Sequence, residues 1–233
     1  MGVIRFSDEE VFGVDSQEYE VLINAAAKIG KTPGAVIEIG TRRGGSMKMI
    51  IDTLVQTGNS GRTVIAVDPY GNIPIECTNL NMSIHNPDRK ITGDKHSKDI
   101  VSPQRFDYDN SMRNRTIPSL YYYGYQAGMN FNFLTLTDLQ YFKRYGDGFP
   151  VYNEEEDIET QYSFVFADGP HDNKTLDLEC EFFVSRMPVG SLFVFDDIWM
   201  YSHDEIVEQK WLFPNGFEIL EKKNIKASYI KTK

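Results

Sequence analysis

The feature that most constrains the fold is a pair of short apolar runs joined by a glycine-bearing turn and a helical stretch. The run Ala35–Ile39 is rich in β-branched residues and is flanked by turn-forming residues, Pro33-Gly34 before it and Gly40 after it. This pattern predicts a buried parallel strand. The turn Gly40–Gly45 leads into a predicted helix over Ser46–Thr57, and Thr63–Val67 is a second predicted strand. Strand, helix and strand in this order predict a βαβ unit with a right-handed crossover.

The second half of the chain alternates in the same way. Tyr162–Ala167 and Ser191–Phe195 are predicted buried strands, and Lys174–Met187 between them is a predicted helix. Two further runs, Phe217–Lys222 and Ala227–Lys231, are expected to form a C-terminal hairpin. These elements predict an α/β fold built on a parallel sheet.

Two further helices are predicted from residues that cap helix starts. One covers Asp15–Ile29, with Asp15 or Ser16 as the cap. The other follows Ser202, which forms a capping-box pattern with Glu205, and reaches about Phe213.

Charge and composition exclude several classes of partner. The chain carries 24 Lys and Arg against 34 Asp and Glu, a net charge of −10, which disfavours binding to nucleic acid and anionic membranes. No apolar run reaches about 18 residues, and the start lacks the basic and apolar segments of a signal peptide. The widely spaced Cys77 and Cys180 fit a reducing compartment. We expect one cytoplasmic domain, residues 1–233, that binds neither nucleic acid nor membrane and could form homo-oligomers.

The turn after the first strand is the first candidate binding site. It lies at the carboxyl edge of the sheet, where open α/β folds bind ligands, and the following helix start offers free N–H groups to a carboxylate or phosphate. A dinucleotide fingerprint would need glycine at Arg42, and a phosphate loop would need a lysine that Gly45-Ser46 lacks. Both phosphate interpretations are therefore weakened, and a turn that serves only helix–strand packing is the alternative.

Asp68 ends the second strand, about two dozen residues after the turn. A carboxylate at this place can accept hydrogen bonds from both ribose hydroxyls. Aspartate also ends many strands without binding anything. Together with the turn, Asp68 points to a cofactor that contains a nucleoside.

A second constellation follows the later pair of strands. Asp168 ends one strand and Asp196-Asp197 the next, so the three carboxylates converge if the strands pair in parallel, about 4.8 Å apart. A divalent cation would relieve their repulsion, and oxygen ligands favour Mg²⁺, Ca²⁺ or Mn²⁺. Alternatively, one aspartate caps a helix and the others face water. His171 could reach the same place as a general base or could only support Asp168 by a hydrogen bond.

Taken together, these residues resemble class I S-adenosylmethionine (SAM)-dependent methyltransferases. Within this class the chain is similar to the metal-dependent O-methyltransferases that act on sugar hydroxyls of macrolide antibiotics, related to macrocin O-methyltransferase. The similarity covers residues 35–70 and 160–200. The motifs that carry it are Glu38–Thr41, Gly44–Ser46, Asp68, Asp168–His171 and Pro188–Ser191 leading to Asp196-Asp197.

The resemblance implies a Rossmann-like fold, with a seven-stranded, mostly parallel sheet, helices on both faces and an antiparallel last strand. It also implies an enzyme that transfers a methyl group from SAM to a hydroxyl of a sugar or glycosylated small molecule. Asp168, Asp196 and Asp197 would bind the metal, expected to be Mg²⁺, and His171 would be the base, with Asp168 also catalytic. The residues implied to bind SAM are Glu38, Gly40, Thr41, Gly44, Gly45, Ser46 and Asp68.

Residues 71–130 match nothing in that family, and we expect them to form a lid or acceptor-binding insertion. A helix is predicted at 115–127 and a strand at Asn130–Thr135. The tyrosines at 121–123 and at 125 suit the C–H faces of sugar rings, although a tyrosine-rich helix packed on the core would explain them equally well.

Other classes of function stay open. A nicotinamide (NAD)-dependent oxidoreductase is one, although Arg42 departs from its fingerprint. A non-catalytic SAM-binding scaffold protein is another, with the carboxylates in a structural role. A protein or nucleic-acid methyltransferase is a third, although the acidic charge argues against nucleic acid.

Overall fold

Two buried strands form the centre of the sheet. The structure is a computed structural model that describes residues 12–14, 16–70, 110–152 and 156–233. Strand β1 (Ala35–Ile39) pairs in parallel with β2 (Thr63–Val67) on one side and with β6 (Tyr162–Ala167) on the other. Every β1 and β6 side chain is buried, as expected for apolar runs covered on both faces.

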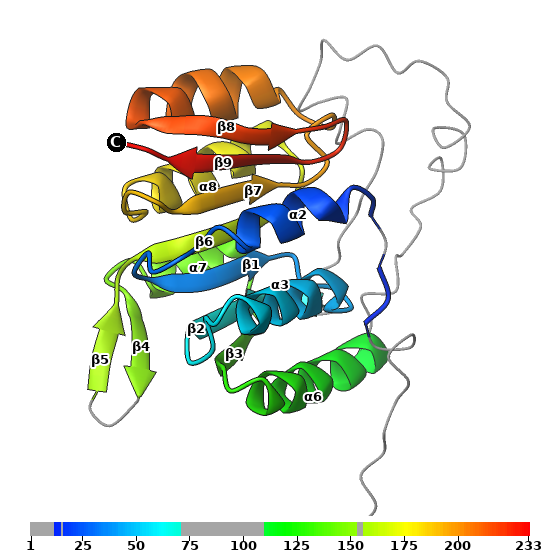
Figure 1. The fold of residues 1–233 in the computed structure, drawn as a ribbon. Coiled ribbons are helices and arrows are strands. Elements are labelled where there is room, and N and C mark those ends of the chain that lie inside the picture. Colours follow the sequence, from blue (N-terminus) through cyan, green and yellow to red (C-terminus); the bar gives the residue numbers. More distant parts are fainter. Residues whose placement is uncertain (1–11, 15, 71–109, 153–155) are drawn as a thin grey trace, which may run out of the picture.

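The sheet has seven strands in the order β3-β2-β1-β6-β7-β9-β8. β3 (Asn130–Leu134) and β7 (Leu192–Phe195) continue the parallel part, while β9 (Ala227–Lys231) is antiparallel to β7 and to β8 (Phe217–Lys222). The predicted seven-stranded, mostly parallel sheet with its C-terminal antiparallel hairpin is therefore confirmed (Figure 1).

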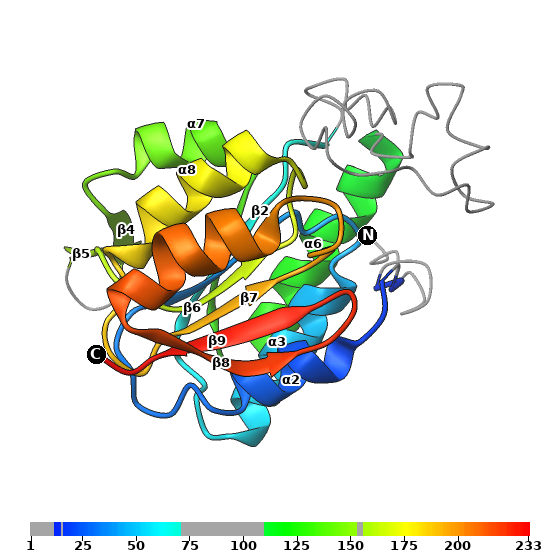
Figure 2. The same ribbon diagram turned by 90° about the horizontal axis from the view of Figure 1, so that it is seen from above.

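Helices cover both faces of the sheet (Figure 2). One apolar cluster joins the sheet to α2, α3 and α6, and a second joins its other face to α7, α8 and the π-helix η2, which a short 3₁₀ turn η3 follows. Their bounds are α2 Tyr19–Ala26, α3 Gly45–Gln56, α6 Asn110–Gln126, α7 Asp138–Arg144, α8 Asn173–Val184, η2 His203–Leu212 and η3 Phe213–Asn215.

The first helix begins later than its sequence predicts. α2 starts at Tyr19. Of the two predicted caps, Asp15 lies outside the described residues, and the Ser16 hydroxyl bonds to Asp196 and Lys226 instead of capping the helix. The residue before α2, Glu18, has a left-handed backbone with φ of 57°, and its carboxylate accepts hydrogen bonds from the backbone N–H groups of Ile225 and Lys226. Glu18 thus ties the segment before α2 to the β8–β9 turn instead of extending the helix.

The capping box predicted at Ser202 does not form, since the Ser202 side chain makes no bond to the start of η2. Asn173 explains the difference, because its side chain accepts from the Ser202 N–H at 2.9 Å and donates to the Ser202 hydroxyl at 3.4 Å. The pair joins the start of η2 to the start of α8.

Three elements have no counterpart in the sequence predictions. Helix α7 begins with a capping box between Thr137 and Gln140, and β4 (Phe149–Tyr152) pairs with β5 (Glu156–Glu159) in a separate two-stranded sheet. This small sheet lies at the opposite end of the molecule from the β8–β9 turn (Figure 1).

The region expected to be a lid or insertion is described from residue 110 onward, and residues 71–109, with Cys77, lie outside the described part. The predicted helix at 115–127 is present as α6, which packs on β3 and α3. On α6, Tyr123 packs against Phe12, while Tyr125 is exposed. None of the described helices combines the length and the apolar character needed to span a membrane.

Candidate active site

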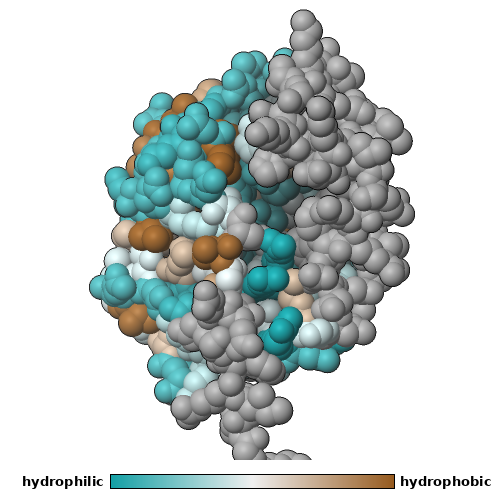
Figure 3. All heavy atoms as spheres, turned by 90° about the vertical axis from the view of Figure 1, so that its right-hand side faces the viewer, coloured by the Kyte–Doolittle hydropathy of each residue, from teal (hydrophilic) through white to brown (hydrophobic). Residues whose placement is uncertain are grey.

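The parallel strands bring every predicted site residue to one edge of the sheet. Asp168 N donates to the carbonyl of Ile39, and Asp196 N donates to that of Ala167, so the residues that follow β1, β6 and β7 lie side by side. This edge is on the right in Figure 1, and the turn between β8 and β9 lies at the same edge. Figure 3 looks onto it and shows strongly hydrophilic atoms near its middle.

Gly40 is required where β1 passes into the turn. Its φ is 90°, and a Cβ built there would lie 1.8 Å from the Asp168 carbonyl oxygen. Its N–H donates to the Val67 carbonyl at 2.8 Å. The carboxyl ends of strands β1, β2 and β6 can approach this closely only because Gly40 has no side chain.

Asp68 holds the turn in place. Its Oδ2 accepts from Arg42 N at 2.8 Å, its Oδ1 accepts from Tyr70 N at 2.8 Å, and the Tyr70 hydroxyl donates to the Arg42 carbonyl at 2.6 Å. Asp68 is only 1% exposed, and burial raises its pKa to about 6, while the bonds from Arg42 and Tyr70 lower it. Because a carboxylate oxygen can accept more than one bond, Asp68 retains capacity for a ligand hydroxyl.

Glu38 is the most unusual polar group at this edge. It is 0% exposed, its Oε1 accepts a hydrogen bond from the Ser46 hydroxyl, and within the described part of the chain its Oε2 has no partner. Burial raises the pKa of Glu38 to about 8. A buried acceptor without a partner, next to the start of α3, suits a ligand that brings its own hydrogen-bond donor.

The remaining predicted cofactor residues lie in the turn before α3 and at the start of this helix, and the segment 12–14 packs against them. Thr41 is buried, and its carbonyl accepts from Gly44 N at 2.7 Å. A Cβ at Gly45 would lie 2.9 Å from the Gly13 carbonyl oxygen, so the segment 12–14 rests against the turn. The start of α3 carries no side-chain cap, which leaves its N–H groups available to an anionic group.

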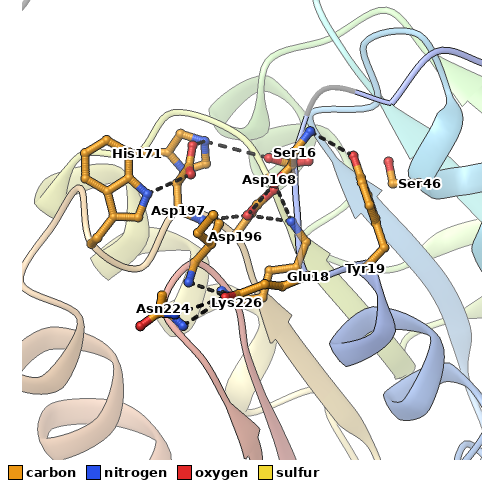
Figure 4. Close-up of polar contacts among 12 residues, drawn as sticks. Ser16, Glu18, Tyr19, Ser46, Asp168, His171, Asp196, Asp197, Asn224 and Lys226 are labelled. Carbon is orange, nitrogen blue, oxygen red and sulfur yellow. Dashed lines mark hydrogen bonds and ion pairs between the residues drawn. The ribbon is translucent and has the colours of Figure 1, made fainter. Parts of the chain in front are cut away.

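The second constellation also comes together at this edge (Figure 4). His171 Nε2 lies 3.7 Å from Asp168 Oδ1 and 3.5 Å from Asp197 Oδ2, and the imidazole stacks parallel to the ring of Tyr201. Asp197 has a left-handed backbone, and its Oδ1 accepts from Trp199 Nε1 at 3.0 Å. The imidazole is therefore held between two carboxylates.

Burial shifts the pKa values of both Asp168 and His171. It raises the pKa of Asp168 well above its ordinary value, and the negative charge of Asp196 raises it further. Burial lowers the pKa of the His171 imidazole, although Asp197 and Asp196 oppose the shift. His171 is therefore neutral at pH 7 and can accept a proton.

Sequence reasoning missed Lys226, the residue before β9. Its Nζ is 2.7 Å from Asp196 Oδ1 and 2.6 Å from the Ser16 hydroxyl, and it lies 4.7 Å from the centre of the Tyr19 ring. Its side chain is 0% exposed. Only the register between β7 and β9 could have revealed it, because that register places Phe195 opposite Ala227.

The predicted metal ligands do not fit a divalent cation as they are arranged. Asp196 Oδ1 accepts from Lys226 and from Asp197 N at 2.8 Å, and Asp197 Oδ1 accepts from Trp199. Across the described ranges, no group of three or more His, Cys, Asp and Glu side chains is placed to hold a metal ion. Asp168, Asp196 and Asp197 do converge, but an ammonium group already neutralises one of them.

Comparison with known proteins gives the fold a class. No protein-family model matches the chain, and no curated protein matches it either. Among solved structures, the O-methyltransferase NovP is similar over 92% of this chain and 79% of its own, with 16% identity and a TM-score of 0.57.

Two further structures agree. The calicheamicin methyltransferase CalS11 matches with a TM-score of 0.61 at 13% identity, over 91% of this chain and 78% of its own. TomG of Streptomyces achromogenes, an O-methyltransferase solved with SAM, matches with a TM-score of 0.53 at 9% identity, over 95% and 82%. The chain thus has the Rossmann-like fold of these methyltransferases, as its sequence predicts.

Proposed function

We propose that the chain is a SAM-dependent O-methyltransferase that methylates a hydroxyl of a sugar or glycosylated small molecule. The observation that carries the proposal is the placement of His171, held between Asp168 and Asp197 at the sheet edge that also carries the glycine turn. The fold shared with NovP, CalS11 and TomG supports it.

The residues around the turn fit SAM. The buried Glu38 Oε2 can accept from the α-amino group, which is a hydrogen-bond donor, and the uncapped start of α3 around Ser46 can donate to the carboxylate. Asp68 is assigned to the ribose hydroxyls. The backbone of Gly40, Thr41, Gly44 and Gly45 allows close approach of the cofactor to the strand end.

Bound SAM supplies a methyl group that is already activated on a sulfonium. The protein has to hold the acceptor oxygen in line with this carbon and remove the hydroxyl proton. As the carbon–sulfur bond breaks and the carbon–oxygen bond forms, the neutral His171 imidazole accepts the hydroxyl proton, and the nearby Asp197 carboxylate stabilises the resulting imidazolium. The products are the methyl ether and S-adenosylhomocysteine.

The acceptor class rests on three observations. Another structure of CalS11 is described as a TDP-rhamnose 3′-O-methyltransferase, at 12% identity and a TM-score of 0.50 over 91% of this chain and 78% of its own. On α6, Tyr122 and Tyr125 are exposed, and residues 71–130 are assigned to the acceptor pocket of a single domain. The net charge of −10 supports a small-molecule acceptor instead of nucleic acid.

A cytoplasmic location and homo-oligomers stay predictions from the sequence.

The test is methyl transfer from SAM labelled on its methyl carbon to a panel of nucleotide sugars, glycosides and aglycones. The proposal expects label in a methyl ether of a sugar-bearing acceptor, with one S-adenosylhomocysteine released for each ether. A non-catalytic scaffold would bind SAM and label none of the acceptors, and labelling of protein or nucleic acid alone would contradict the acceptor class.

A further inference from the structure

The sheet register brings a lysine to the carboxylate cluster. β7 and β9 pair antiparallel, with Phe195 opposite Ala227. The residue after β7, Asp196, and the residue before β9, Lys226, therefore lie next to each other at the carboxyl edge. Glu18 fixes this turn, because its carboxylate accepts from the backbone N–H groups of Ile225 and Lys226 at 2.8 and 3.1 Å.

The Lys226 ammonium is held on several sides. Asp196 Oδ1 lies 2.7 Å away, the Ser16 hydroxyl accepts at 2.6 Å, and the face of the Tyr19 ring is 4.7 Å away at its centre. Ser16 in turn donates to Asp196 Oδ1 at 3.2 Å, so the lysine, the serine and the aspartate form a closed set of contacts (Figure 4). A cation with this many partners is not a mobile surface lysine.

We propose that Lys226 takes the position of a divalent cation at the cluster of Asp168, Asp196 and Asp197, so that the chain binds no divalent cation there. The ammonium supplies the positive charge that converging carboxylates need. A divalent ion bound to the same carboxylates would be repelled by the fully buried Lys226 ammonium, because the protein interior screens this repulsion only in part. Methyl transfer by this chain is then independent of added metal.

The same exchange predicts what removal of Lys226 does. Lys226→Met keeps the length of the side chain and removes its charge, which leaves Asp196 buried without its counter-ion. Buried carboxylates in this state recruit another cation or a proton. Oxygen ligands at one sheet edge favour Mg²⁺ or Mn²⁺, so the variant gains a site that the parent chain lacks.

The test measures Mn²⁺ binding by equilibrium dialysis and by electron paramagnetic resonance, without SAM or acceptor, so that its outcome is independent of methyl transfer. The proteins are the parent chain, Lys226→Met and the control Lys223→Met. Lys223 lies in the same turn, but it is partly exposed and pairs with Glu20. The proposal expects no saturable Mn²⁺ site in the parent chain or in Lys223→Met, and an affinity at least about tenfold higher in Lys226→Met.

Two results would overturn the proposal. One is saturable Mn²⁺ binding in the parent chain that Asp196→Asn removes, and the other is a folded Lys226→Met that binds Mn²⁺ no better than the parent. If Lys226→Met does not fold alone, Lys226→Met with Asp196→Asn removes both charges, and thermal unfolding decides. This double variant should be more stable than Lys226→Met. If both variants lose the same stability relative to the parent chain, this would also contradict the proposed pairing.

Discussion

His171 is the residue whose removal should separate chemistry from binding. Replacement of His171 by Ala removes the proposed proton acceptor, and loss of a general base costs about 10²–10⁴ in rate. We expect kcat to fall within this range while calorimetry shows unchanged SAM affinity. Imidazole added to the assay should restore part of the rate, because it can enter the space and take up the proton.

A purely supporting role for His171 gives a different result. The imidazole would then only orient Asp168 and Asp197, which lie 3.7 and 3.5 Å from its Nε2. In that case imidazole would not rescue the variant, and His171→Gln, which keeps a hydrogen-bonding amide, would retain most of the activity.

Glu38 gives a pH dependence that can be measured without any substrate. Its pKa is raised from 4.5 to about 8 by burial, so between these values the folded state binds more protons than the unfolded state. The stability contributed by the protonated form is therefore lost as pH rises through this window. Urea denaturation of the parent chain and Glu38→Gln from about pH 5 to pH 8 should show the parent losing more of its free energy of unfolding.

The other titrating groups are common to both proteins, so the difference between the two curves isolates Glu38. Parallel curves over the whole range would show that Glu38 is ionised in the folded protein. The unpartnered Oε2 would then need another explanation.

At the scale of elements, the turn after β1 depends on Gly40. Gly40→Ala would place a Cβ 1.8 Å from the Asp168 carbonyl oxygen at a φ of 90°, so β1 and β6 must separate at the site. We expect a loss of at least about 3 kcal/mol in the free energy of unfolding, as for overpacking combined with backbone strain, and weaker SAM binding.

Gly58→Ala is the matched control, because Gly58 also has a positive φ, of 72°, but a Cβ there meets nothing within 4 Å. It should lose only the backbone term of about 1–2 kcal/mol and keep its SAM affinity. Similar losses in the two variants would mean that the close approach of β1 and β6 is not what requires Gly40.

The central strands were predictable from sequence because each is a short buried run with turn residues on both sides. β1, β2 and β6 begin and end where the apolar runs at 35–39, 63–67 and 162–167 do. The start of α2 was not predictable, since Glu18 bonds to two residues of a turn that lies 207 and 208 positions away along the chain. Nearby residues carry no sign of such a contact.

The same distinction holds within the site. Asp68, Asp168 and Asp196 could be placed at one edge because each directly follows a strand of a parallel sheet. Lys226 could not be found by this rule, as it precedes an antiparallel strand, and its pairing with Asp196 depends on the strand order β7-β9-β8. For this reason the resemblance implied a metal at carboxylates that include Asp196, whereas the structure pairs Asp196 with the buried ammonium group of Lys226.

At the scale of the whole molecule, the central claim is that this sheet edge binds SAM. The measurement is isothermal titration of the folded chain with SAM, S-adenosylhomocysteine and NAD in a buffer containing EDTA, repeated with Asp68→Asn. We predict one SAM site per chain, much weaker NAD binding, and a loss of about 1–3 kcal/mol in SAM binding for Asp68→Asn, which removes a charged acceptor. Tighter binding of NAD than of SAM, or no SAM binding by the folded chain, would contradict the account.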